Sequence, residues 1–259
     1  MLGCTGARVR GCAYNRTVRP RFFLPAIDAS GHGELDRDES GHLARVMRLG
    51  VGAEIDVFDG RGAMFRARVV ELGRSGVRVE VLEPSPAAPE PAVHVTLVMS
   101  VLKGDRMDDV VRDAAMMGVA AIQPVFSAHG EVGLEATARG RRRERWQRIA
   151  VSSVKQCGRA TVSDVREPLP LSIWMTRSRD APVLVLTEPR AGKGVALSDL
   201  PRHPAVRLLV GPEGGWSPAE GAAFEEAGFR PVSLGGRTLR ADSVPLVALA
   251  ALFEAWNAW

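Results

Sequence analysis

Two glycine-rich turns near the C-terminus hold the residues best suited to chemistry. The apolar run 208–210 leads into Gly-Pro-Glu-Gly-Gly-Trp at positions 211–216, and the run 232–234 leads into Gly-Gly-Arg-Thr-Leu-Arg-Ala-Asp-Ser at positions 235–243. Glycine lets backbone approach a ligand closely because no Cβ intervenes. Ligands of open α/β sheets bind beyond the carboxyl ends of the strands. The turns therefore predict a small-molecule site, although glycines that only terminate strands would give the same pattern.

Strands and helices alternate around these turns, from residue 93 onward. Gly118 and Gly158 close two predicted helices, and Ser217 with Glu220 forms a capping-box pattern at the start of another, which Gly228 stops. Strands are predicted over residues 93–101, 121–126, 183–186, 206–210 and 232–234, and further helices over 106–117, 141–156 and 246–259. This alternation is typical of an α/β fold with a mostly parallel sheet covered by helices.

The N-terminal part has the pattern of a small β-domain followed by a linker. Short strand-like segments are separated by turn residues and span residues 55–58, 64–70 and 77–82. Residues 83–91 contain four prolines, which remove backbone donors and restrict the residue before them. We therefore expect two domains joined by this segment.

Composition sets broad limits on the class of protein. The chain has 259 residues, 46% of them hydrophobic, which is enough for one large or two modest domains. The 34 Lys and Arg against 30 Asp and Glu leave a mild positive surplus that suits a polyanionic partner. No apolar run of about eighteen residues appears, so we expect no membrane-spanning helix.

The cysteines and histidines indicate a protein of a reducing compartment that binds no metal, and the first residues have the composition of a tail. The three cysteines and five histidines lack the spacing of a disulfide framework or a metal site, which favours the cytoplasm and predicts no metal. Residues 1–19 contain four arginines and no acid, and we interpret them as a disordered basic tail, with an organellar transit peptide as the alternative. The first strand of the α/β region leads into Leu-Lys-Gly-Asp at 102–105, which disfavours a Rossmann-type or Walker-type site.

The motifs together resemble a known family. Gly-Pro-Glu-Gly-Gly-Trp-Ser followed by Leu-Gly-Gly-Arg-Thr-Leu-Arg and an acidic residue is similar to the SPOUT methyltransferases that make N3-methyluridine in small-subunit (16S) ribosomal RNA. Further matching motifs fall in the same order and lie at residues 21–23, 42–48, 57–60, 102–107, 145–147 and 158–159. The resemblance covers the chain after the first twenty residues. It implies a PUA-like RNA-binding β-barrel over 20–88 and a SPOUT methyltransferase domain over 89–259, its sheet tied into a trefoil knot.

The resemblance also implies a cofactor site. S-adenosylmethionine would sit among three loops, the one after residues 183–186 and the two glycine turns, with Leu234 and Leu239 as apolar walls. For Glu213, proton transfer is possible, but we favour a structural role in which its carboxylate receives backbone amides. The expected cofactor-binding residues are Thr187, Glu188, Gly211, Glu213, Gly215, Leu234, Gly235, Gly236, Thr238 and Leu239.

Methyl transfer to uridine N3 would need a proton acceptor and a donor for charge on the flanking carbonyls. Arg240 suits the second task because its planar fork offers several donors. Asp242 is the candidate base, but it stands where the family has the longer glutamate. The alternative is that Asp242 or Ser243 caps the last helix, which has Pro245 in its first turn.

Basic residues at family positions are expected to bind RNA phosphates. The arginine run from 139 to 148 has an alternative interpretation as a solvated helix face. The expected RNA-binding residues are Arg21, Arg48, Lys103, Arg141, Arg142, Arg159 and Arg237.

Several positions depart from the family pattern and leave alternatives open. The stretch around Met116, just before the helix-ending Gly118, lacks the glutamate that the family commonly has before its leucine-glycine. Lys155 replaces an acidic residue, and Gly236 replaces proline. The main hypothesis is an enzyme that acts on ribosomal RNA or the small subunit. One alternative is a non-catalytic RNA-binding or ribosome-assembly protein, and another is a methyltransferase with a different RNA target. The apolar final helix, with Trp256 and Trp259, predicts a homodimer interface, with intramolecular burial as the alternative.

Overall fold

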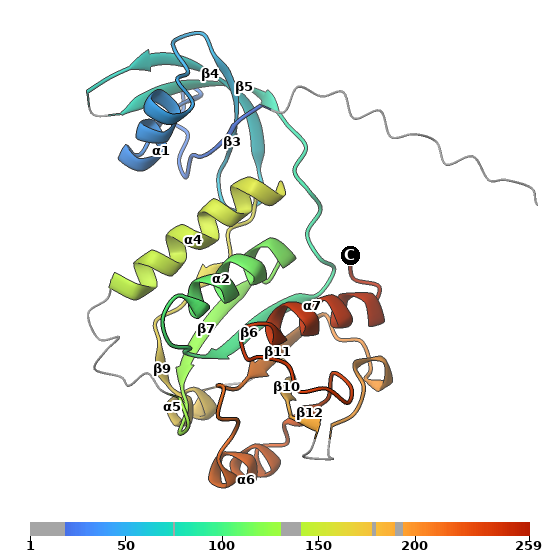
Figure 1. Cartoon of the computed structure of the whole chain (residues 1–259). Helices are drawn as coiled ribbons and strands as arrows, with labels where there is room; N and C mark the ends of the chain where they lie inside the picture. The colour runs from blue at the N-terminus through green and yellow to red at the C-terminus, as the bar shows by residue number, and fades with distance from the viewer. Residues whose placement is uncertain (1–18, 75, 131–140, 178–179, 190–193) are drawn as a thin grey trace, which may run out of the picture.

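The computed structural model describes residues 19–74, 76–130, 141–177, 180–189 and 194–259. They form a curled sheet stacked on a layered α/β body (Figure 1). Residues 1–18, most of the predicted tail, lie outside the described residues, as do Cys4 and Cys12. Arg19, which the prediction includes in that tail, donates its Nε to Asp56 Oδ1 at 3.1 Å.

The N-terminal sheet has five strands in the order β1-β3-β4-β5-β2. It curls around a core that includes Phe22, Ile55 and Val79, and Leu43 from the helical segment closes one side. The strands are β1 Arg21–Phe23, β2 His32–Leu35, β3 Glu54–Phe58, β4 Met64–Leu72 and β5 Val77–Pro84, with α1 Arg37–Gly41 and η1 His42–Val46. No pairing among the described residues joins β1 to β2. The expected barrel is therefore an open half-barrel, edged by strands of only three and four residues.

The second sheet is parallel throughout and has the order β12-β10-β11-β6-β7-β8, with β9 also paired to β7. Its strands are β6 His94–Ser100, β7 Ala121–Phe126, β8 Asp164–Val165, β9 Leu169–Pro170, β10 Val183–Leu186, β11 Ala205–Val210 and β12 Arg230–Val232. Its helices are α2 Arg106–Met117, α4 Arg141–Cys157, α5 Leu171–Thr176, α6 Pro218–Glu226 and α7 Val244–Ala255, with a short turn η3 at Leu197–Asp199. The predicted α/β fold with a mostly parallel sheet is confirmed.

Alternate residues of the buried strands face two separate cores. Leu208 and Val210 pack with α2, α4 and α7 on one face, whereas Leu209 packs with Trp174 of α5 and Phe224 of α6 on the other. This follows from the period of two along a strand, because a central parallel strand is covered on both faces. The sheet is therefore the middle layer of a three-layer sandwich, and packing on both faces fixes the positions of the strand ends and of the loops that follow them.

Two predicted elements differ from the structure by two residues or more at both ends. The strand expected over 232–234 covers Arg230–Val232, because Ser233 turns away to bond the Val195 carbonyl. The last helix covers Val244–Ala255 rather than 246–259. None of the helices within the described ranges is long and apolar enough to cross a membrane.

Candidate active site

Three loops converge beyond one edge of the parallel sheet. Strands β12, β10 and β11 are neighbours and run in parallel, so the loops that follow them meet at their common carboxyl end. A cavity of about 740 Å³ lies among these loops. That volume falls in the range of roughly 300–1,000 Å³ typical of small-molecule sites. The structure thus brings together the two glycine turns and the loop after β10.

Almost all of the predicted cofactor residues line this cavity. The exception is Gly236, which is exposed outside the lining. Apolar side chains from Val185, Leu186 and Val244 contribute to the walls beside Leu234 and Leu239. The lining includes Thr187, Glu188, Gly211, Glu213, Gly215, Leu234, Gly235, Thr238 and Leu239.

Trp216 is a lining residue that sequence reasoning did not assign. Its indole Nε1 donates to the Leu186 carbonyl at 3.2 Å, which ties the loop after β11 to the end of β10. Its ring lies over Gly211, where a Cβ would come within 3.0 Å of it, and packs edge-on against Phe224 at 5.0 Å between centroids. The sequence feature that could have identified Trp216 is its position directly after Gly214 and Gly215, where an aromatic ring can fill the space that the glycines leave.

Glu213 is held by a side chain rather than by backbone amides. Its Oε1 accepts a hydrogen bond from Arg106 Nη1 at 2.6 Å, across 107 positions of sequence. Gly215, with φ of 67°, completes the turn by donating its amide to the Pro212 carbonyl at 3.0 Å. A Glu188 carboxylate oxygen lies 3.1 Å from where a Cβ on Gly215 would be. The positive φ and this close approach both explain a glycine there.

The predicted catalytic pair lies beside the cavity. Arg240 and Asp242 flank Ala241, which lines it, and Arg240 Nη2 donates to Asp242 Oδ2 at 2.9 Å. The Arg240 side chain is 72% exposed and that of Asp242 is 17% exposed. Ser243 is the N-cap residue of α7 but makes no side-chain cap bond. The structure therefore does not support the capping alternative, and it pairs the two candidates with each other.

Two of the predicted RNA-binding arginines are used inside the protein. Arg159 is 4% exposed, donates to Glu90 from Nε and Nη2, and also bonds the Ala115 carbonyl at the end of α2. Arg21 donates to the carbonyls of Lys155 and Arg159 at 3.0 and 3.2 Å, and burial lowers the pKa of its guanidinium. These contacts place both guanidinium groups at the junction of the two bodies, where each already has partners within the protein.

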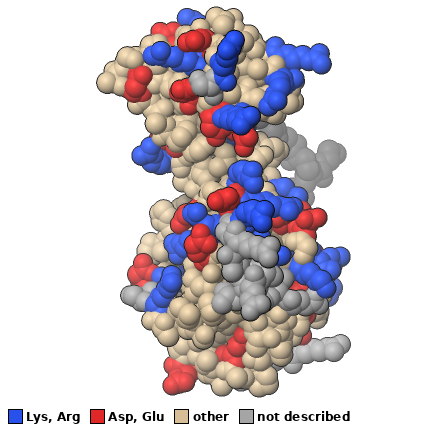
Figure 2. All heavy atoms as spheres, turned by 90° about the vertical axis from the view of Figure 1, so that its left-hand side faces the viewer, with Lys and Arg blue, Asp and Glu red and all other residues tan. Residues whose placement is uncertain are grey.

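The other predicted RNA-binding residues, namely Arg48, Lys103, Arg141, Arg142 and Arg237, are exposed. Arg237 also lines the cavity. Within the arginine run, Arg143 bonds the Val165 carbonyl and Arg145 bonds Asp105, so this part of the helix is occupied by protein contacts. Arg139 lies outside the described residues. On the face shown in Figure 2, basic side chains lie on both bodies with acidic ones among them.

Metal ligands do not gather in the part of the chain that the structure describes. No three His, Cys, Asp or Glu side chains lie close enough there to hold an ion. The cavity combines apolar walls and backbone groups with the neighbouring Arg240–Asp242 pair. An α/β domain with such a cavity beyond the carboxyl ends of its strands is typical of folds that bind small molecules.

Comparisons with known proteins specify the family. Residues 89–253 match the RNA methyltransferase domain family, and residues 35–82 match the RNA methyltransferase PUA domain family. The chain therefore belongs to the RNA methyltransferase family. It is similar to the ribosomal RNA small subunit methyltransferase E of Synechocystis sp., with 32% identity over 92% of this chain and 76% of that protein. The enzyme of the same name from Mycobacterium bovis is 30% identical over 92% of both chains.

Solved structures agree with these relatives over most of the chain. A ribosomal RNA small subunit methyltransferase E from Neisseria gonorrhoeae, bound to S-adenosylmethionine, is 34% identical with a TM-score of 0.83 over 92% of this chain and 98% of that one. A methyltransferase from Legionella pneumophila, in complex with the same cofactor, has 27% identity and a TM-score of 0.85 over the same shares.

Proposed function

We propose that this protein transfers the methyl group of S-adenosylmethionine to N3 of a uridine in small-subunit (16S) ribosomal RNA. The observation that carries the proposal is the cavity among the three loops, in a chain whose fold matches a relative bound to S-adenosylmethionine over 92% of its length. The small-subunit RNA target is supported by the names of relatives at 30–32% identity.

The residues of the cavity fit this cofactor. Its volume of about 740 Å³ is of the size typical of small-molecule sites, its walls combine aliphatic side chains with glycine-turn backbone, and Glu188 offers a carboxylate beside them. When bound there, S-adenosylmethionine supplies an electrophilic methyl group. The expected binding residues are Thr187, Glu188, Gly211, Glu213, Gly215, Leu234, Gly235, Gly236, Thr238 and Leu239.

The chemistry left to this chain is the handling of a proton and of charge. As the methyl carbon leaves sulfur and bonds to N3, the N3 proton must leave and negative charge grows on the uracil carbonyls. Arg240, exposed and held by Asp242, can donate to those oxygens. Asp242 accepts the Arg240 bond on Oδ2, which orients the guanidinium, and its other oxygen, Oδ1, is the candidate acceptor for the N3 proton.

Further parts of the proposal concern organisation. We propose a PUA-like RNA-binding domain over 20–88, a methyltransferase domain over 89–259 tied in a trefoil knot, and a location in the cytoplasm. Homodimer formation through α7 and the residues after it is supported by Leu246, Val247 and Trp259, which are 39%, 40% and 62% exposed in the single chain, whereas Trp256 is buried within it. Sedimentation at micromolar concentration should give a dimer, and a fully active monomer would contradict that part.

The test is the identity of the product. The substrate is either small subunits or naked 16S RNA, taken from a strain that lacks its own small subunit methyltransferase E. The purified protein is incubated with this substrate and S-adenosylmethionine, and the RNA is then digested for nucleoside mass spectrometry. We expect 3-methyluridine at one position. Cofactor binding with no methylated nucleoside in either substrate would favour the non-catalytic alternative, and a different methylated nucleoside would show another target.

A further inference from the structure

The first turn of α2 contacts the glycine turn at 211–216 through Arg106. Arg106, the first residue of α2, donates Nη1 to Glu213 Oε1 at 2.6 Å, and Glu213 lines the cavity. We infer that Arg106 is a positioning residue that holds the Gly-Pro-Glu-Gly-Gly turn in its cofactor-binding shape through Glu213. This inference rests on the proposed function, because it concerns the same cavity.

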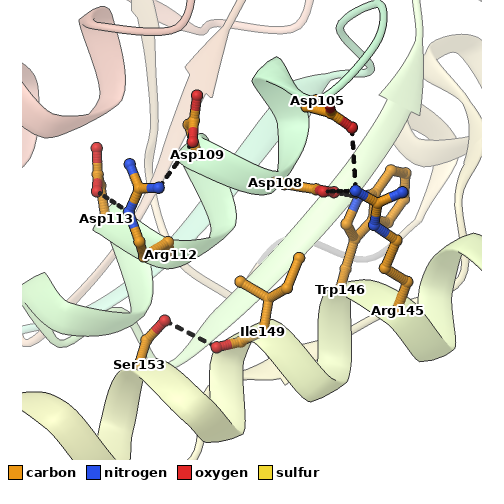
Figure 3. Close-up of polar contacts among 9 residues, drawn as sticks. All are labelled: Asp105, Asp108, Asp109, Arg112, Asp113, Arg145, Trp146, Ile149 and Ser153. Carbon is orange, nitrogen blue, oxygen red and sulfur yellow. Dashed lines mark hydrogen bonds and ion pairs between the residues drawn. The ribbon is translucent and has the colours of Figure 1, made fainter.

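The anchor on the α2 side is rigid. Figure 3 shows Asp108 reached from α4 by both Arg145 and Trp146. The indole Nε1 of Trp146 donates to Asp108 Oδ1 at 3.1 Å, and the Trp146 and Met107 side chains are buried in the main core. Arg145 also bonds Asp105, the residue just before α2. The helix start is thus bound to a second helix on both sides of Arg106, so a contact from Arg106 is made from a fixed point.

On the other side, Trp216 anchors the end of the turn to the Leu186 carbonyl, and Glu213 lies in the glycine-rich part before it. Residues 211–215 contain three glycines, whose backbones have wide conformational freedom. The turn has its own bond from Gly215 to Pro212, and the His129 Nδ1 atom lies 3.1 Å from the Gly214 carbonyl oxygen. Both are contacts to backbone, and Glu213 carries the charged side chain of the turn. A charge-assisted bond to a fixed helix selects one turn shape among those that glycine allows.

The Arg106–Glu213 ion pair should matter for binding and not for global stability. Its side chains are 47% and 33% exposed, and exposed pairs contribute little to unfolding free energy. An ordered turn binds a ligand more tightly than a disordered one because less freedom is lost on binding. The expected signature is therefore weaker cofactor binding at an unchanged melting temperature.

The test compares Arg106→Met with Arg112→Met. Arg112 is a matched control on the same helix, since its side chain is 50% exposed and pairs with Asp109 and Asp113 (Figure 3), and none of these residues lines the cavity. Calorimetry of the full chain should show the Kd for S-adenosylmethionine raised about fivefold in Arg106→Met and unchanged in Arg112→Met. The KM for RNA and the melting temperature should match wild type in both variants. Glu213→Gln should give a similar loss, and the double variant no further loss.

Three results would overturn the inference. The first is an unchanged Kd for S-adenosylmethionine in Arg106→Met. The second is a raised KM for RNA with normal cofactor binding. The third is a melting temperature lowered enough that the loss of stability accounts for the weaker binding. If wild type itself binds no S-adenosylmethionine, the proposed function fails instead. Amide hydrogen exchange in the ligand-free protein still tests the positioning role, because residues 211–216 should exchange faster in Arg106→Met than in Arg112→Met. Equal exchange rates there would overturn it.

Discussion

Arginines follow glycines within a few residues both at the carboxyl ends of the methyltransferase strands and at the junction beneath the β-domain, but the two regions use them differently. At the edge, the Arg240 side chain is 72% exposed, whereas at the junction that of Arg159 is 5% exposed with donors bound to Glu90 and Ala115. A guanidinium can serve a ligand only where the fold leaves its donors accessible. The motif alone does not distinguish the two, because burial is decided by residues far away in sequence.

The junction also explains one departure from the family pattern. Lys155, which stands where the family has an acid, donates Nζ to both carboxylate oxygens of Glu39 at 2.8 Å, and lies 5.4 Å from the centre of the Phe22 ring. The side chains of the ion pair are 18% and 10% exposed. The substitution is therefore matched by an acid in α1, and it fastens the β-domain to the end of α4.

The largest expected effect is on folding at the junction. Arg159→Met should lower the free energy of unfolding by about 2–4 kcal/mol, because Glu90 and the Ala115 carbonyl lose a buried partner. Urea denaturation measures it, with Arg112→Met expected within about 0.5 kcal/mol of wild type. A stable Arg159→Met variant with a reduced salt dependence of RNA binding would instead return Arg159 to the RNA surface.

At the edge the expected effect is on turnover. Arg240→Ala should lower the single-turnover rate roughly 10²-fold, the usual loss on removing one donor to developing charge, with the Kd for S-adenosylmethionine and the unfolding free energy little changed. Asp242→Asn should give a smaller loss with an unshifted pH profile if Asp242 orients Arg240. Wild-type turnover in Arg240→Ala would remove it from the catalytic residues.

A charge reversal sharpens the account of Lys155. Lys155→Met should lower the free energy of unfolding by about 1–3 kcal/mol, because the carboxylate of Glu39, which is 10% exposed, loses its partner. The exchange Glu39→Lys with Lys155→Glu should recover part of that loss, as a double-mutant cycle would measure. No recovery would mean that packing against Phe22, rather than charge pairing, dominates this contact.

The smallest effect is expected on the exposed start of α4. Arg141→Ala with Arg142→Ala should weaken RNA binding and flatten its log–log dependence on salt by up to about one unit for each phosphate that the variant no longer binds. Binding titrations across a salt series measure the slope, with Arg112→Ala as the control. An unchanged slope would support the alternative of a solvated helix face.

The sequence predicted local features well and long-range pairings poorly. The limits of α2, β7 and β10, and the capping box of Ser217 and Glu220, follow from periodicity and cap chemistry within one segment. That the three loops meet was implied by the family resemblance, and the neighbouring parallel strands β12, β10 and β11 give the physical reason. The pairs Arg106–Glu213 and Arg159–Glu90 join residues 107 and 69 positions apart, and no local pattern encodes them. The early end of β12 likewise depends on the distant bridge between Val195 and Val232.

The central claim, that the edge loops form the cofactor site, is tested most directly by calorimetric titration of S-adenosylmethionine into two glycine variants. Gly235 lies in the cavity lining with φ of 98°, and Gly52 lies in the β-domain with φ of 89°, both with open space around an added Cβ. The backbone strain of a valine is therefore similar at the two positions. We expect Gly52→Val to bind like wild type and Gly235→Val to show no detectable heat. Wild-type affinity in Gly235→Val would contradict the account and move the cofactor site elsewhere.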